Sequence, residues 1–312
     1  MDKYILSSSP HVRSVETTGR IMRDVLIALL PATVLGIWFF GLSALAVVLL
    51  SVAAAVGTEA LLQKLMHKKI TLSDGSAAVT GLLLALNLPP SVPLYIPIIG
   101  SIFAIAIVKQ CFGGLGHNFL NPALAARAFL VASWPTAMTT WTMPVDAVSS
   151  ATPLAAVKVA GAGDPSPYLD MLLGNVGGCI GETSALALVI GGLYLIARRV
   201  IDPRIPIVYI ATVAVFTWVA GPEGLFTGNA IYHILAGGLM LGAFFMATDY
   251  ATSPMSVSGK VVFALGCGVL TSVIRLWGGY PEGVSYSILL MNLVVPLIDR
   301  AFQPKRFGGV RA

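Results

Sequence analysis

Charged residues are scarce in this chain. Only 11% of the 312 residues are Asp, Glu, Lys or Arg, whereas soluble domains carry about 25%. Hydrophobic residues make up 56% of the sequence, and the mean hydropathy is +0.86. This composition excludes a water-soluble globular protein of this size and predicts a protein embedded in a lipid bilayer.

Cysteines and basic patches are equally sparse. The three cysteines, Cys111, Cys179 and Cys267, are far apart in the sequence, and none belongs to a Cys-x-x-Cys pair. A disulfide framework and a metal site are therefore not expected. No basic stripe interleaved with aromatic residues occurs, which argues against nucleic acid as a partner. The formal charge of +5 comes from clusters between apolar runs, which is typical of membrane flanks.

Apolar runs are abundant and divide the chain into about ten candidate transmembrane segments. The clear ones cover residues 25–40, 42–62, 95–108, 184–197, 205–219, 230–247, 261–276 and 284–297. Two more, residues 77–88 and 118–133, are short or interrupted by Pro, Asn and Arg. Such short segments survive at membrane depth only where protein or a cavity covers them. The predicted fold is an all-α polytopic membrane protein of about ten helices, some of them short and interrupted.

The basic residues predict the orientation. With the N-terminus inside, 16 of the 19 Lys and Arg residues fall on the cytoplasmic side of ten threaded segments. Lys158 and Arg275 fall in outside connections, and Arg127 lies within a segment. This distribution obeys the positive-inside rule. Both termini are then expected in the cytoplasm, and the long stretch of residues 134–182 outside it.

The two halves, residues 1–133 and 183–312, share a pattern. In each half a polar residue is followed by a proline, an apolar span, a basic residue and a Gly-Gly pair. The positions are Asn87, Pro90, Lys109 and 113–114 in the first half and Asp249, Pro254, Arg275 and 278–279 in the second. Five spans lie between equivalent points of the two halves. Because this number is odd, the second half crosses the membrane in the opposite direction, which predicts two inverted five-helix repeats with the loop 134–182 between them. Chance spacing of Gly and Pro is the alternative.

A run of small hydroxylated residues lies in the long outside loop. The run matches the pattern D-x-x-[ST]-[GS]-A-[ST] at Asp146, Ser149, Ser150, Ala151 and Thr152. Flavin transferases use this pattern to attach FMN through a phosphoester to its last residue. The proline that follows disfavours helix at Thr152. The pattern predicts an exposed Thr152 that carries FMN. An ordinary Ser/Thr turn is the alternative.

Further polar residues interrupt apolar sequence. Residues 113–122 contain Asn118 and Asn121, which share a face if they are helical and offer amide donors and acceptors. Glu59 and Arg127 are ionisable groups at membrane depth, where such groups are functional by default. Glu59 is only five residues from Lys64, so reaching the membrane interface is an alternative role for it.

Six segments spread along the chain carry a family resemblance. They are SDGSAAVTGLLLALNLPP (73–90), FGGLGHNFLNPALAARAF (112–129), SSATPLAA (149–156), GGCIGETSALALVIGG (177–192), FMATDYATSP (245–254) and GGYPEGVSYSILLMNLVVPLID (278–299). The chain resembles the D subunits of the Rnf complex, a membrane-bound ferredoxin:NAD oxidoreductase. It is more distantly similar to the B subunits of the sodium-pumping NADH:quinone reductase, whose longer N-terminal extension it lacks.

The resemblance implies a flavin-carrying subunit of a redox-driven pump, in which electrons pass between reduced ferredoxin and NAD while sodium or protons are exported. It implies FMN on Thr152, and it implies riboflavin held without a covalent bond near Asn118, Asn121 and Asp249. Capping of interrupted helices is the alternative role for these three polar residues. No residue of the chain is expected to act as acid, base or nucleophile on a substrate, because the electron chemistry belongs to the cofactors.

The resemblance also implies partners and a location. The partners are the Rnf subunits A, B, C, E and G, a flavin transferase and the lipid of a bacterial or archaeal plasma membrane. Two other functions stay open on the sequence: the B subunit of the quinone reductase, and a flavin-free channel or transporter with inverted repeats.

Overall fold

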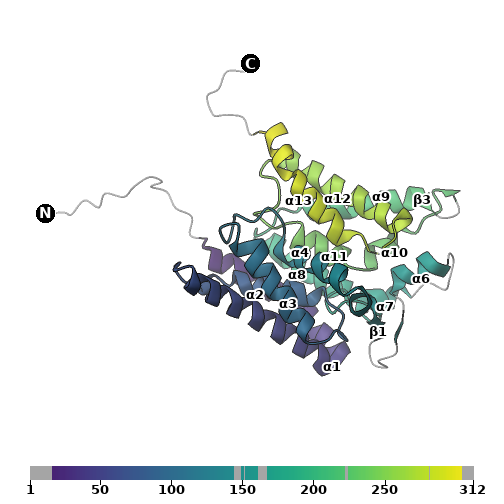
Figure 1. The fold of residues 1–312 in the computed structure, drawn as a ribbon. Coiled ribbons are helices and arrows are strands. Elements are labelled where there is room, and N and C mark those ends of the chain that lie inside the picture. Colours follow the sequence, from purple (N-terminus) through teal and green to yellow (C-terminus); the bar gives the residue numbers. More distant parts are fainter. Residues whose placement is uncertain are drawn as a thin grey trace, which may run out of the picture.

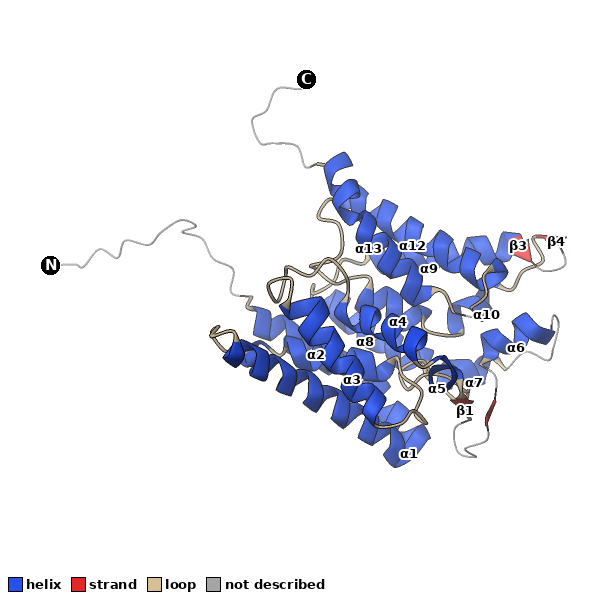
Figure 2. Ribbon diagram, viewed as in Figure 1, coloured by secondary structure: helices blue, strands red, loops and turns tan. Residues whose placement is uncertain are grey.

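The structure is a computed structural model that describes residues 16–143, 149–150, 152–160, 167–221, 224–280 and 282–303. Its regular structure is almost entirely helical (Figure 2). The larger helices are α1 (Thr18–Leu65), α2 (Ser76–Leu86), α3 (Tyr95–Phe103), α4 (Pro122–Ser133), α8 (Ala185–Ala197), α9 (Arg204–Val219), α12 (Val257–Trp277) and α13 (Val284–Ala301).

Shorter elements connect these helices. They are the 3-10 turn η1 (Leu72–Asp74), the π-helical segments η2 (Ala104–Gln110) and η3 (Gly242–Met246), the helices α5 (Pro135–Thr139), α6 (Pro153–Ala160), α7 (Tyr168–Leu173), α10 (Ala230–Leu235) and α11 (Leu239–Leu241), and the strands β1 (Trp141–Thr142), β2 (Ser149–Ser150), β3 (Ala220–Gly221) and β4 (Gly224–Leu225). The strands pair as two small antiparallel ladders, β1 with β2 and β3 with β4.

The helices form two groups (Figure 1). Helices α1, α2 and α3 pack together on one side of the molecule, and α9, α12 and α13 pack together on the other. Helices α4 and α8 and the segment η3 lie between the groups, where α8 packs against α1 and α4 packs against α13. One apolar core runs through both groups. Asn87 at the end of α2 and Asn121 at the start of α4 are buried against this core, so these two polar groups are enclosed by protein, as the bilayer requires.

Helix α1 consists of two arms joined at Gly41. This residue has φ 69° and ψ −148°, a conformation that a residue with a Cβ rarely adopts. The arms, residues 18–40 and 42–65, agree with the two predicted segments that end and begin at this glycine. The predicted boundary is confirmed.

Length separates the helices into two kinds. Among the described residues, three helices are long and apolar enough to cross a membrane: α1, α12 and α13. Helices α2 and α4 have 11 and 12 residues, or about 18 Å at a rise of about 1.5 Å per residue. That is shorter than the hydrocarbon layer of about 30 Å. The prediction of short, interrupted helices at these two places is confirmed, and the chain is a helical membrane protein.

The segment 230–247 is not the single span that its hydropathy predicts. It is divided into α10, α11 and η3, with Gly237 at φ 69° in the break. The physical reason is a buried cation. The guanidinium of Arg275 donates to the backbone carbonyl of His233 and, at 3.1 Å, to that of Ala236. Arg275 on α12 therefore supplies hydrogen-bond donors to carbonyl groups at the end of α10, which have no partner within the helix.

Candidate functional site

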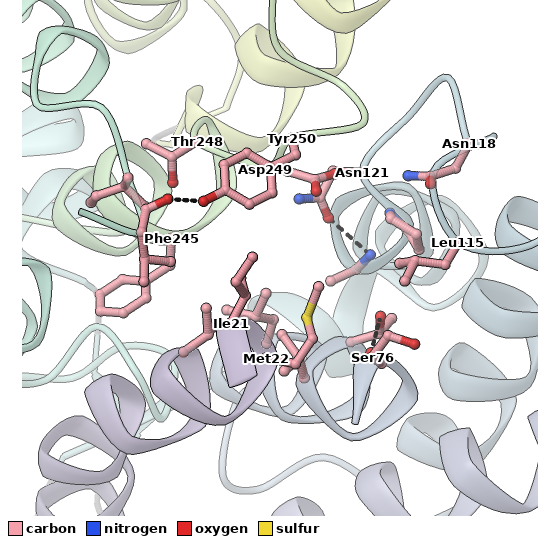
Figure 3. Close-up of a pocket in the computed structure, with 18 of the residues that line it drawn as sticks. Ile21, Met22, Ser76, Leu115, Asn118, Asn121, Phe245, Thr248, Asp249 and Tyr250 are labelled. Atoms are coloured by element: carbon pink, nitrogen blue, oxygen red, sulfur yellow. Dashed lines mark hydrogen bonds between the residues drawn. The ribbon is translucent and has the colours of Figure 1, made fainter. Parts of the chain in front are cut away.

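A pocket opens where α1, α2 and α4 begin and η3 ends (Figure 3). Its empty volume is about 780 Å³, counting the part open to solvent. Ile21 and Met22 contribute to its apolar wall. Asn118, Asn121 and Asp249 all line it, so the structure brings the three predicted residues together. We call this cavity the Asn121 pocket.

Asn121 is held in place by the start of α4. Its side-chain oxygen accepts hydrogen bonds from the backbone N–H groups of Ala123 at 3.1 Å and Leu124 at 3.3 Å, which is an N-cap. Its amide nitrogen donates to the carbonyl of Met246 at 3.3 Å, at the end of η3. The residue therefore ties together two interrupted helices and at the same time borders the pocket, so the predicted alternatives of cap and pocket residue are both compatible with its position.

Asn118 does not share a helical face with Asn121. Pro122 is the first residue of α4 and disfavours helix at Asn121, which has φ −65° and ψ 119°. Asn118 lies in the preceding turn, where its amide donates to the carbonyl of Leu120 at 3.0 Å. The two residues meet at the pocket because the chain turns there, and not because of helical spacing.

Asp249 lines the pocket from the loop after η3. Its carboxylate accepts a hydrogen bond from the hydroxyl of Thr252 at 3.1 Å. Burial raises the pKa of the Asp249 carboxyl above its usual range. Thr248 and Tyr250, its neighbours in the chain, line the same pocket. This wall offers a ligand a carboxylate and a hydroxyl acceptor.

A buried ion pair borders the pocket beside α2. The ammonium of Lys109 lies 2.9 Å and 3.0 Å from the two carboxylate oxygens of Glu59, and both side chains are 2% exposed. Lys109 also donates to the hydroxyl of Ser76 at 2.6 Å, and Gln110 donates to Glu59 at 2.9 Å. Ser76 and Lys109 both line the pocket. The pocket therefore has a cation on one wall and Asp249 on another.

This pairing corrects two expectations. Lys109 is not a flanking charge in water, and Glu59 does not extend to the membrane interface, which was the alternative role suggested by the nearness of Lys64: it turns inward to Lys109. The reason is that Glu59 and Lys109 lie on neighbouring elements, α1 and η2, which pack together. Two charges that pair inside the protein each reduce the cost of burying the other.

A second buried cluster surrounds Arg127 on α4. Its guanidinium lies 2.8 Å from a carboxylate oxygen of Glu282 and 3.4 Å from one of Glu182. It also donates to the side-chain oxygen of Asn87 at 3.0 Å and to the hydroxyl of Ser285 at 3.1 Å. The predicted importance of Arg127 thus has a structural basis: one cation joins the end of α2, the loop before α8 and the start of α13.

Sequence reasoning missed the acidic partners of this cluster. Glu182 and Glu282 are isolated acidic residues in Gly-rich breaks before an apolar helix, GGCIGETS and GGYPEGVS. That position was the available signal, because an acid at the start of a membrane helix needs a buried partner. Arg275 was expected in an outside connection and is instead 4% exposed, at the break in 230–247.

Thr152 lies at the start of α6. Its hydroxyl accepts a hydrogen bond from the backbone N–H of Ala155 at 3.2 Å, and its side chain is 3% exposed. The expectation of an exposed threonine was therefore wrong in this conformation, because the hydroxyl caps the helix. Ser149 and Ser150 form β2, paired with β1. Asp146 and Ala151 of the predicted attachment motif lie outside the described residues.

The fold and these sites define a class: a helical membrane protein whose pocket and buried ion pairs lie at breaks between short helices. Comparison with known proteins narrows this class. The sequence model of the NQR2, RnfD, RnfE family matches residues 5–308. The chain belongs to this family.

Relatives match over nearly the whole chain. The D subunit of the Na(+)-translocating ferredoxin:NAD(+) oxidoreductase complex of Acetobacterium woodii is 56% identical, over 98% of this chain and 95% of the relative. The D subunit of the proton-translocating ferredoxin:NAD(+) oxidoreductase complex of Clostridium ljungdahlii is 52% identical, over 99% and 97%. The D subunit of an ion-translocating oxidoreductase complex of Stutzerimonas stutzeri is 40% identical, over 94% and 92%.

Proposed function

We propose that this chain is the D subunit of an ion-translocating ferredoxin:NAD oxidoreductase. The observation that carries the proposal is identity above 50% over almost the full length of two relatives named as such subunits. One of those names specifies Na+ and the other specifies protons, so the proposal names ion translocation and not the ion. The chain then works in the plasma membrane as one member of a complex, together with the Rnf subunits A, B, C, E and G.

We also propose ten helices in two inverted repeats with both termini in the cytoplasm. The elements correspond in order: the two arms of α1, α2, α3 with η2, and α4 in the first half; α8, α9, α10 to η3, α12 and α13 in the second. The third member is short or broken in both halves. A buried cation stands at matching places, Lys109 at the end of η2 and Arg275 near the end of α12. This order supports the repeat.

We propose that Thr152 carries FMN, and the start of α6 suits this group. A phosphoester on the hydroxyl would place its negative charge at the N-terminus of a helix of eight residues, where unpaired N–H groups and the helix dipole favour an anion. The backbone N–H of Ala155 already points at the hydroxyl oxygen. The bound FMN would supply one- and two-electron transfer. Because Thr152 is buried, the transferase has to act on a conformation in which this segment is open.

Replacement of Thr152 by alanine should abolish covalent flavin. The complex is produced together with its flavin transferase, and the fluorescence of this chain is recorded on a denaturing gel. Wild-type protein should fluoresce, and mass spectrometry should find an FMN-sized addition on the peptide that contains Thr152. Thr152→Ser is the matched control, since it keeps a hydroxyl and the helix cap. Flavin that persists in Thr152→Ala would refute the assignment.

We further propose that the Asn121 pocket holds riboflavin. Its apolar walls suit a planar ring, while the amides of Asn118 and Asn121 and the carboxylate of Asp249 suit polar ring edges and a polyol. The ammonium of Lys109, which already binds Glu59 and Ser76, adds a positive charge to one wall. These groups come from several separate segments of the chain, so the pocket offers donors and acceptors on several sides.

Asp249→Ala should lower riboflavin occupancy. A buried polar partner left without its hydrogen bond costs about 1–3 kcal/mol, which weakens binding about 5- to 150-fold. The measurement is extractable riboflavin per covalent FMN in the purified complex. Asp170→Ala, an acid on α7 outside the pocket, is the control and should keep the wild-type ratio. If Asp249→Ala and Asn118→Leu both keep that ratio as well, riboflavin is held elsewhere.

A further inference from the structure

A second cavity lies at the other end of α4 from the Asn121 pocket. Its empty volume is about 480 Å³, counting the space open to solvent. Asn121 caps the start of α4, and Val131, which lines the second cavity, is ten residues further on, or about 15 Å along the helix. Three aromatic side chains line this cavity, Trp141, Tyr280 and Tyr286. We call it the aromatic cavity.

The segment that carries Thr152 contacts both sides of the aromatic cavity. On one side, Ser150 pairs with Trp141 in the β1–β2 ladder. On the other side, the ammonium of Lys158, on α6, donates to the backbone carbonyl of Tyr280 at 2.9 Å. Thr152 stands in the chain between these two contacts, and the two residues from Ser150 to Thr152 span at most about 7 Å. The start of α6 is therefore close to the cavity on a chain anchored at two points.

An FMN arm attached to Thr152 has the reach for this cavity. The arm consists of a phosphate and a five-carbon ribityl chain, comparable in length to about three extended residues, or about 10 Å. Partners in a β-ladder are about 5 Å apart. A ring on such an arm can enter the cavity while Thr152 keeps its place at the start of α6.

The chemistry of the lining fits a flavin ring. A planar ring system stacks on aromatic faces, and the rings of Tyr280 and Tyr286 lie 5.3 Å apart at 30°. The edge of the ring has acceptors that need a donor and one N–H that needs an acceptor. Arg127 and Glu282 line the cavity side by side, 2.8 Å apart. The cavity thus offers both aromatic walls and a donor next to an acceptor.

We propose that the aromatic cavity seats the ring of the flavin carried by Thr152. This inference rests on the proposed attachment of FMN and adds the residues that hold the ring. Seated there, the ring is enclosed by Trp141, Tyr280 and Tyr286, and it lies beside the buried Arg127 cluster that joins the two halves of the fold.

The test is the fluorescence of the covalent flavin in the intact complex, because Trp and Tyr rings in contact with a flavin quench it. Fluorescence per covalent flavin should be low in the native wild type and should rise when the complex is unfolded. In Tyr280→Leu and Tyr286→Leu, the ratio of seated to free ring should fall about two- to ten-fold for each ring removed, so native fluorescence rises while covalent flavin content stays the same.

A third variant, Ala128→Leu, fills the cavity from α4 and should raise native fluorescence in the same way. The control is Trp218→Leu, which removes a half-exposed aromatic residue outside the cavity and should change nothing. If covalent flavin is present but all three cavity variants keep wild-type fluorescence, the ring is seated elsewhere. If the wild type carries no covalent flavin, the proposed attachment itself fails, and the denaturing gel distinguishes this outcome.

Discussion

Replacing Arg127 by methionine is expected to prevent accumulation of the folded protein in the membrane. The substitution leaves the carboxylates of Glu182 and Glu282 buried without their shared cation. Removing one partner from a buried ion pair costs about 3–5 kcal/mol, and a folded protein is stable by only about 5–15 kcal/mol. The side chain of Arg127 also binds Asn87 and Ser285, so separate segments of the chain lose a common anchor.

The measurement for Arg127→Met is the amount of monodisperse protein after detergent extraction, together with the temperature at which it aggregates. Arg204→Met is the matched control, because the side chain of Arg204 is half exposed and its partner Asp202 keeps Lys260 at 2.9 Å. An exposed pair contributes about 0–1 kcal/mol, so this variant should behave as wild type. Equal stability of Arg127→Met and Arg204→Met would show that Glu182 and Glu282 can stay buried in the folded protein without the positive charge of Arg127.

Replacing Lys109 by methionine should also destabilise the protein strongly, by about 3–5 kcal/mol, because it leaves Glu59 as a buried charge without its cation. Adding Glu59→Gln should restore most of the loss, since Gln at position 59 is neutral and can still bind Gln63 and Gln110, which now donate to the carboxylate. We expect the two substitutions to be strongly coupled, with the double variant more stable than Lys109→Met alone.

Thermal aggregation of the single and double variants measures this coupling. The control is Lys64→Met, in the last turn of α1, where the side chain is exposed and a change of less than about 0.5 kcal/mol is expected. If Lys64→Met destabilises the protein more than Lys109→Met does, Glu59 pairs at the membrane interface after all, and the buried pair does not contribute.

Local signals in the sequence were sufficient for much of the fold. Apolar length predicted a helical membrane protein and most of its segments, since the thickness of the bilayer sets the length of a helix that crosses it. The bend in α1 was predictable because a glycine separates two apolar runs. The start of α4 at Pro122 was not recognised as a boundary, although Asn followed by Pro is a signal for the first residues of a helix.

The candidate sites were predictable only in part. Asn118, Asn121 and Asp249 were singled out by polarity in apolar sequence and by family resemblance, and they do share a pocket. Their meeting does not follow from spacing, because Asp249 comes from the other half of the chain. The attachment motif around Thr152 is legible in the sequence. The burial of its hydroxyl is not, because it depends on how α6 packs.

The sequence by itself determined the class of protein and the approximate positions of the helices, because these depend on composition and on neighbours in the chain. Only the tertiary structure decided which charges are paired. Glu59 and Lys109 are 50 residues apart, and Arg127 meets Glu182 and Glu282 across 55 and 155 residues. It also decided the break in 230–247, since Arg275 on α12 supplies the donors that let α10 end there. Apolar length can predict a span, but a buried charge is stable only beside a partner that packing brings to it.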